Sequence, residues 1–119
     1  MKTNDILTVY VGYVEGSGGK KRPVLVTKNF ADRIEVFKIT SKFANKSPYI
    51  KQQYYPIEDW EAAGLYKQSW VDLGSRLSIP KKGVTFKQIG RLTAHDQISI
   101  DKFQTQLNKI RNFQKNAKK

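Results

Sequence analysis

Two short segments of this sequence carry residues that suit the chemistry of a phosphodiester. In residues 16–26, a glycine-rich basic loop leads to Arg22 at the start of a β-rich run. In residues 36–41, a β-rich run ends on the hydroxyl pair Thr40 and Ser41. A guanidinium grips phosphate through a planar fork of donors, and hydroxyls and loop amides add further donors. Together the segments predict a phosphate-binding site.

An antiparallel hairpin would bring the two segments together. The runs 22–28 and 33–40 read as strands joined by a short turn, so Arg22 and Thr40 are expected at the same end. Each residue also has an ordinary structural reading. Arg22 can pair with a carboxylate such as Glu15, and the Thr40 hydroxyl can bond to nearby backbone.

The rest of the chain predicts a small, strongly bent antiparallel sheet followed by one helix. We expect a short helix over residues 58–63, ended by Gly64. A capping box at Thr93–Asp96, with Asp in place of Glu or Gln, opens the last helix. Apolar residues at helical spacing continue this helix, and a basic tail from about residue 112 is expected to fray. The expected strands are 6–14, 22–28, 33–40, 54–57, 69–73, 75–80 and 84–92.

Composition restricts the classes of function. A length of 119 residues fits one domain spanning 1–119, and there is no Cys for a disulfide or thiolate metal site. No apolar run is long enough to span a membrane. The net charge of +12 attracts polyanions, although a merely solvated basic surface has the same composition. The rings expected to stack on single-stranded nucleic acid are Phe43, Tyr49, Tyr54 and Tyr55.

Several catalytic classes do not fit. His95 is the only histidine, so a pair of histidines cannot act as acid and base within one chain. Its place at a helix start also disfavours the charged imidazolium and indicates a surface or capping role. No acidic cluster suggests a two-metal nuclease, and the loop at 16–21 lacks the spacing of a P-loop. We therefore predict no metal and no cofactor.

Four segments, taken in order, resemble the MazF/PemK family of toxin–antitoxin ribonucleases. The resemblance covers roughly residues 5–110. Its motifs are Lys-Arg-Pro-Val-Leu-Val at 21–26 after the Gly/Ser loop, Ile-Thr-Ser at 39–41, Ser-Trp-Val-Asp-Leu at 69–73, and Lys-Gln-Ile-Gly-Arg-Leu at 87–92 ahead of the last helix.

The resemblance implies a mainly β protein, a small SH3-like antiparallel β-barrel with a C-terminal helix, of the plasmid-maintenance-toxin type. It implies a metal-independent, sequence-selective endoribonuclease that cleaves single-stranded RNA to 2′,3′-cyclic phosphate and 5′-hydroxyl ends. As a toxin it would be a cytoplasmic homodimer, neutralised by a small, acidic, partly disordered antitoxin. The alternatives are a non-catalytic SH3-like module that binds RNA or protein, and a related toxin that acts on a protein such as gyrase.

The resemblance and the residue types together identify the candidate site. The catalytic candidates are Arg22, Thr40 and Asp72. The group that removes the 2′ proton stays open between Asp72 and the substrate itself, since arginine is nearly always protonated. The candidate RNA-binding residues are Ser17, Gly18, Lys20, Lys21, Ser41, Lys42, Lys46, Tyr49 and Arg76.

Overall fold

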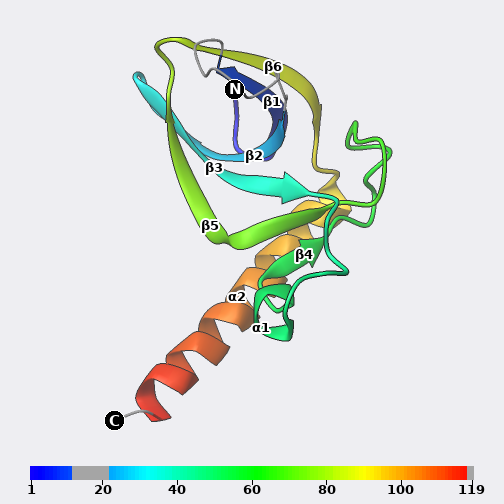
Figure 1. Ribbon diagram of the computed structural model, residues 1–119, viewed down its shortest axis with the longest axis vertical. Coiled ribbons are helices and arrows are strands. Elements are labelled where there is room, and N and C mark those ends of the chain that lie inside the picture. Colours follow the sequence, from blue (N-terminus) through cyan, green and yellow to red (C-terminus); the bar gives the residue numbers. More distant parts are fainter. Residues whose placement is uncertain (12–21, 118–119) are drawn as a thin grey trace.

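The computed structural model describes residues 1–11 and 22–117 (Figure 1). The chain folds into one six-stranded sheet and a long C-terminal helix that projects from it. The strands are β1 (Asp5–Val11), β2 (Arg22–Asn29), β3 (Arg33–Thr40), β4 (Tyr54–Pro56), β5 (Trp70–Pro80) and β6 (Val84–Arg91), and the helices are α1 (Pro48–Lys51) and α2 (Ala94–Ala117).

The sheet is strongly curved and open. Its strand order is β4-β5-β3-β2-β1-β6, and every neighbouring pair is antiparallel. β4 and β6 are the two edges, so the barrel expected from the sequence is not closed within the described residues. The predicted class, a small antiparallel β fold with a C-terminal helix, is confirmed.

The hairpin of β2 and β3 sets the position of the first two candidate residues. Val24 lies opposite Lys38, and Leu25 lies opposite Phe37. The turn that joins the strands is closed by a hydrogen bond of 2.9 Å from the Phe30 N–H to the Arg33 carbonyl. Because Arg22 begins β2 and Thr40 ends β3, this register brings both to one end of the hairpin, as predicted.

β5 is one bent strand rather than the two strands expected at 69–73 and 75–80. Phe37 pairs with Arg76, but the next residue of β3, Lys38, pairs with Asp72. Residues 73–75 therefore form a bulge, and bulges bend a strand while keeping its pairing on both sides. Figure 1 shows the resulting bend in β5. The bulge places the first part of β5 beside β4, where Asp72 lies opposite Tyr54.

Alternating apolar residues give the sheet two buried faces. One face packs beneath the first half of α2, which contributes Ile100 and Leu107. The other face lies inside the curve of the sheet and is built on Leu7, Val24, Val26, Ile34 and Val36. Apolar side chains therefore line the inside of the curve.

The short helix expected at 58–63 is a series of turns instead, and residues 58–68 together form the turn segment that leads toward β5. The carbonyl of Trp60 accepts from the Leu65 N–H and that of Glu61 accepts from the Gly64 N–H, both at 3.0 Å. This pattern, with φ of 91° at Gly64, is a Schellman ending without a preceding helix. The start of the segment is held elsewhere, because the carboxylate of Asp96 accepts from the Glu58 and Asp59 N–H groups at 3.0 and 2.8 Å.

The predicted capping box of α2 forms only in part. The Thr93 hydroxyl accepts from the Asp96 N–H at 3.4 Å, as expected of an N-cap. The Asp96 carboxylate does not return to the cap; it is fully buried and also accepts from the Tyr55 hydroxyl at 2.5 Å. Asp96 therefore joins α2 to β4 and to the turn segment.

The end of α2 departs from the frayed tail expected from about residue 112. The helix continues to Ala117, since no Gly or Pro interrupts this stretch. Its outer half leaves the sheet, so Ile110 and Phe113 are exposed. The apolar stripe therefore packs at Ile100 and Leu107 and has no core to cover beyond them.

Candidate functional site

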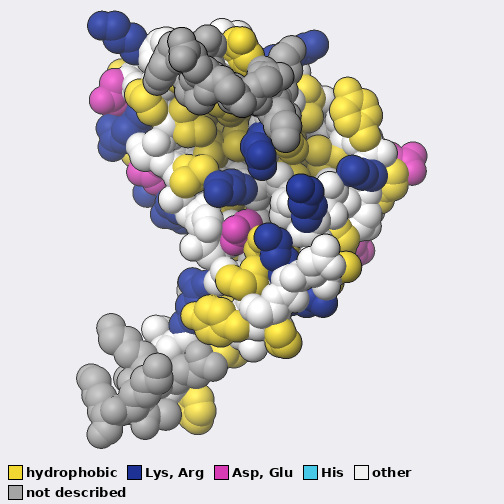
Figure 2. Space-filling model, in the orientation of Figure 1, with side chains coloured by type: hydrophobic (Ala, Val, Ile, Leu, Met, Phe, Trp, Pro, Cys, Tyr) yellow, Lys and Arg dark blue, Asp and Glu magenta, His cyan; other side chains and the backbone are white. Residues whose placement is uncertain are grey.

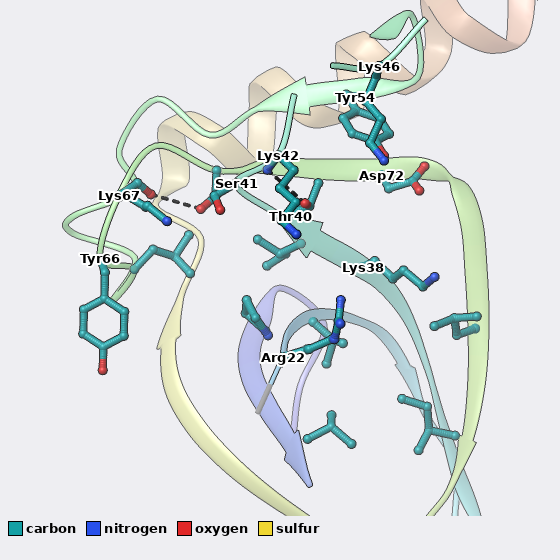
Figure 3. Close-up of a pocket in the computed structure, with 18 of the residues that line it drawn as sticks. Arg22, Lys38, Thr40, Ser41, Lys42, Lys46, Tyr54, Tyr66, Lys67 and Asp72 are labelled. Carbon is teal, nitrogen blue, oxygen red and sulfur yellow. Dashed lines mark hydrogen bonds between the residues drawn. The ribbon is translucent and has the colours of Figure 1, made fainter. Parts of the chain in front are cut away.

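A cleft of about 770 Å³ opens at the end of the hairpin that carries Arg22 and Thr40 (Figure 3). Its walls come from β1, β2, β3, β5 and the segment that leads into β5. Apolar side chains from the inner face of the sheet form part of its lining. The lining residues are Val9, Tyr10, Arg22, Pro23, Val24, Lys38, Ile39, Thr40, Ser41, Lys42, Lys46, Tyr54, Leu65, Tyr66, Lys67, Ser69, Asp72, Leu77 and Ile79.

The charge of the cleft is strongly positive. Of the described lining residues, five are basic and Asp72 alone is acidic. Figure 2 shows Lys and Arg side chains gathered across the middle of one face of the molecule. A concave surface with one sign of charge focuses its field on an incoming polyanion. The basic lining residues are Arg22, Lys38, Lys42, Lys46 and Lys67.

Arg22 and Thr40 are the central polar pair of the cleft. Arg22 is exposed, and Figure 3 draws its guanidinium among the lining side chains. The Thr40 hydroxyl oxygen accepts a hydrogen bond of 3.1 Å from the Lys42 N–H, which is the local backbone role anticipated for this residue. This bond uses one acceptor site of the oxygen, so the hydroxyl can still donate to a ligand.

Asp72 lies on the cleft wall between two strands. Across the sheet it faces Lys38 on one side and Tyr54 on the other. One carboxylate oxygen accepts from the Gly74 N–H at 2.9 Å, which fixes the side chain at the bulge. Burial, together with the nearby Asp72 charge, raises the pKa of the Tyr54 hydroxyl. Asp72 thus has a definite structural role and also one face toward the cleft.

Sequence reasoning missed four of the lining residues that carry charge or a ring. Lys38 lies opposite Asp72 in the pairing of β3 with β5, and this register cannot be read from the sequence. Tyr66 and Lys67 lie between the helix expected at 58–63 and the strand expected at 69–73, where no element was predicted. The sequence offered only one indication that Tyr66 and Lys67 belong to the site, which is their position just before the strand motif at 69–73. The missed residues are Tyr10, Lys38, Tyr66 and Lys67.

Some predicted binding residues lie elsewhere. Tyr49 is on α1 and lines a separate, shallow hollow with Leu107 and Arg111. Arg76 stacks over Phe37 at 5.2 Å and approaches the Glu35 carboxylate at 4.0 Å, and it is not among the cleft residues. Ser41, Lys42 and Lys46 do line the cleft. The predicted residues Ser17, Gly18, Lys20 and Lys21, and the alternative partner Glu15, lie outside the described residues.

Most of the rings expected to stack on nucleic acid are part of the protein interior. Tyr54 and Tyr55 are buried, and burial raises the pKa of the Tyr55 hydroxyl, with its bond to Asp96 adding to the effect. Phe43 stacks on Trp70 with ring centroids 4.6 Å apart. Tyr49 alone of the four is largely exposed, at 67%. The expectation was therefore wrong for Tyr55. Tyr54 does line the cleft but is buried, and the exposed rings of the lining are Tyr10 and Tyr66.

His95 lies at the surface, as predicted, and away from the cleft. Its Nε2 is 2.8 Å from the Glu58 carboxylate. That hydrogen bond, with the charge of Glu58, raises the pKa of His95, so the carboxylate outweighs the helix start that was expected to disfavour the charged ring.

Metal-ligand clusters and membrane-spanning helices are both absent from the part of the chain that the structure describes. No three His, Cys, Asp or Glu side chains of residues 1–11 and 22–117 come together in a metal-ligand arrangement. Over the same residues, neither helix combines the length and the apolar character needed to cross a membrane.

Comparison with known proteins supports the fold. No protein-family model matches the sequence, and no curated protein sequence matches it either. Among solved structures, the chain is similar to the Mycobacterium tuberculosis toxin MazF-mt6, with a TM-score of 0.56 and 20% identity. The match covers 81% of this chain and 90% of that one. The fold of this chain is therefore MazF-like.

Proposed function

We propose that this protein is an endoribonuclease toxin that cuts single-stranded RNA in the cleft. The observation that carries the proposal is the meeting of Arg22, Thr40 and Asp72 in one basic cleft on a MazF-like fold. A basic groove that follows a flexible backbone suits single-stranded nucleic acid.

In the proposed reaction the RNA supplies its own nucleophile. The ribose 2′-oxygen attacks the adjacent phosphorus, the bond from phosphorus to the 5′-oxygen breaks, and a 2′,3′-cyclic phosphate and a 5′-hydroxyl result. The proton of the 2′-hydroxyl must leave, and a proton must reach the departing 5′-oxygen. Arg22 neutralises the extra negative charge that develops at phosphorus, and the Thr40 hydroxyl donates to a phosphate oxygen. This chemistry needs no metal ion.

Two groups are candidates for the base that takes the 2′ proton. One is Asp72, a largely buried residue of the cleft lining that has one carboxylate oxygen bonded to the Gly74 N–H. The other is an oxygen of the substrate phosphate. Replacing Asp72 by Asn separates them, because a substrate-assisted reaction keeps its rate and a reaction with Asp72 as base loses most of it.

The test of the nuclease is direct. Purified protein is incubated with mixed single-stranded RNA in EDTA, and the ends of the products are analysed. We expect cyclic phosphate and 5′-hydroxyl ends, and no cleavage of the all-deoxy strand, which lacks the 2′-hydroxyl. Persistent inactivity of folded protein toward diverse RNAs contradicts the proposal, and equal cleavage of the all-deoxy strand contradicts the 2′-hydroxyl mechanism.

The proposal extends to partners and setting. We propose a homodimer in the cytoplasm, selective for a short RNA sequence and neutralised by a small acidic antitoxin whose tail enters the basic cleft. An acidic, disordered tail would associate rapidly and in a salt-dependent manner. A small acidic reading frame beside the gene supports this part, and sedimentation of the purified protein tests the dimer.

One observation favours a second candidate, a module that binds RNA without cutting it. Asp72 is held by the Gly74 N–H, and the Thr40 hydroxyl is held by the Lys42 N–H, so both have structural reasons to be present. Salt-sensitive RNA binding without cleavage in the same assay identifies the module. The same result from a folded, antitoxin-free sample rejects the nuclease.

A further inference from the structure

Tyr66 stands at the rim of the cleft with almost no protein around it. It is 97% exposed, more than any other large hydrophobic residue in the described chain. An aromatic ring left in water gains nothing from burial, so the fold itself has no need of a ring at this position.

The segment that carries Tyr66 is nevertheless held firmly. On one side, Leu65 packs against the main core cluster and Gly64 ends the turn in a left-handed conformation. On the other side, the Gln68 side-chain amide donates to the carbonyls of Ile57 and Ser69 at 2.9 and 3.0 Å. The exposure of the ring is therefore not a consequence of a loose segment, and the ring is presented from a fixed support.

The support is reinforced by close backbone packing. A Cβ atom added at Gly64 would lie 2.2 Å from the carbonyl oxygen of Ile89, and one added at Gly90 would lie 1.8 Å from that of Ala63. The turn segment thus lies directly on β6, and only glycines allow this approach. This packing fixes the position of the segment that carries Tyr66 relative to β6.

The surroundings of Tyr66 match what a nucleotide needs. Lys67 is the next residue, and both line the cleft with Arg22. Figure 3 shows Tyr66 on one side of the cleft and Asp72 on the other, with Arg22 between them in this view. A second, partly exposed ring, Tyr10, also lines the cleft.

We propose that Tyr66 is a stacking platform for one nucleobase of the bound strand, next to the phosphate held by Arg22. This rests on the proposed function for the identity of the ligand as single-stranded nucleic acid. Every base has a flat π-face, so the platform contributes affinity and positions the strand without selecting a sequence. The rings inside the fold, Tyr54 and Tyr55, are too buried to take this role.

The experiment separates binding of bases from binding of phosphates. Two fluorescent hexanucleotides are used as probes: a 2′-O-methyl oligouridylate, which blocks the 2′-oxygen, and an abasic phosphodiester of the same length. Affinities are measured at several salt concentrations for wild type, Tyr66→Ala and Tyr66→Phe. Tyr49→Ala is the matched control, because Tyr49 is also a largely exposed tyrosine but lies outside the cleft.

We expect Tyr66→Ala to weaken binding of the base-bearing probe by about 5- to 150-fold, the range of one base–aromatic stack. Binding of the abasic probe and the salt dependence should not change. Tyr66→Phe keeps the ring and should bind as wild type does, as should Tyr49→Ala. Because Tyr66 is so exposed, the melting temperature should be the same in all variants.

Three results overturn the platform. They are an unchanged affinity in Tyr66→Ala, an equal loss for both probes, and a wild-type protein that does not prefer the base-bearing probe. Failure of the nuclease is a separate result, because the probes are not cleaved. Stacking at Tyr66 in a protein that leaves RNA intact supports the platform and rejects the nuclease alone.

Discussion

The hydroxyl of Tyr55 on β4 donates a hydrogen bond of 2.5 Å to the carboxylate of Asp96 on α2. The carboxylate is fully buried and also accepts from the backbone N–H groups of Glu58 and Asp59. One side chain therefore connects the C-terminal helix, the edge strand and the turn segment that carries Tyr66. These contacts anchor the start of that segment.

We expect Asp96→Ala to lower the free energy of unfolding by about 3–5 kcal/mol, because one buried and two partly buried donors lose their acceptor and an unpaired buried donor costs about 1–3 kcal/mol. Tyr55→Phe removes one hydrogen bond to a charged group and should cost less, about 1.5–3 kcal/mol. Urea unfolding of the three proteins measures both values. A native-like stability of Asp96→Ala contradicts the structural role.

Arg22→Ala should reduce RNA cleavage by at least about a hundredfold, the effect of losing one preorganised charge-stabilising donor. Thr40→Ala should cost somewhat less, and His95→Ala should cost little because His95 lies outside the cleft. Arg33→Ala is the matched control, since Arg33 is at the opposite end of the same hairpin. Initial rates and a melting curve are measured for each variant. Full cleavage activity of a folded Arg22→Ala protein would show that the reaction does not depend on Arg22, and would contradict the proposed mechanism.

Lys46→Ala should flatten the dependence of RNA affinity on salt. For single-stranded nucleic acid, removing the cation that neutralises one phosphate should reduce the slope of log affinity against log salt by about 0.7. Sequence preference should not change. Lys109→Ala, on the exposed part of α2, removes the same charge away from the cleft and should keep the slope. Binding of a non-cleavable RNA at four salt concentrations measures the slopes, and equal slopes for all three proteins count against the cleft as the RNA site.

Gly90→Ala should destabilise the fold by about 1–3 kcal/mol, as overpacking does. The new Cβ would meet the backbone oxygen of Ala63 at 1.8 Å, and backbone cannot turn aside. Gly74→Ala is the comparison, because its Cβ would meet only the end of the Gln53 side chain, which can rotate away. Thermal melting should therefore show a clear loss for Gly90→Ala and a smaller one for Gly74→Ala; the reverse order contradicts the packing of the turn on β6.

Stability should fall with acid partly through Asp5. Burial raises the pKa of the Asp5 carboxyl, but hydrogen bonds from the Lys2 N–H and the Arg91 guanidinium outweigh burial and hold the pKa below its ordinary value. A carboxyl with a lowered pKa in the folded state stabilises the fold above the unfolded-state pKa of about 3.9. That contribution is lost as the pH falls through the folded-state pKa.

The measurement for Asp5 is the free energy of unfolding at pH 7 and pH 3. Asp5→Asn should be less stable than wild type at pH 7 and should lose less on going to pH 3. Asp101→Asn, at an exposed position on α2, controls for the removal of one negative charge. A pH dependence of Asp5→Asn identical to that of wild type rejects this role.

The sequence by itself determined the β2–β3 hairpin and the meeting of Arg22 and Thr40. These features are local: two β-rich runs with a short turn between them have few alternative pairings, and an antiparallel hairpin places the start of one strand beside the end of the next. The strands at 54–57 and 84–92 and the start of the last helix were also predicted from local patterns. The class of fold followed from these elements.

Only the tertiary structure decided which other residues enter the cleft. Lys38 faces Asp72 because of a bulge in β5, and a change of register is set by packing between strands far apart in the sequence. Asp96, which was expected to complete a cap, is drawn instead to Tyr55 and the turn segment, because a buried carboxylate needs several donors at once. The burial of Tyr55 and the exposure of Tyr66 depend in the same way on long-range packing, so composition could indicate that rings are present but not which of them line the cleft.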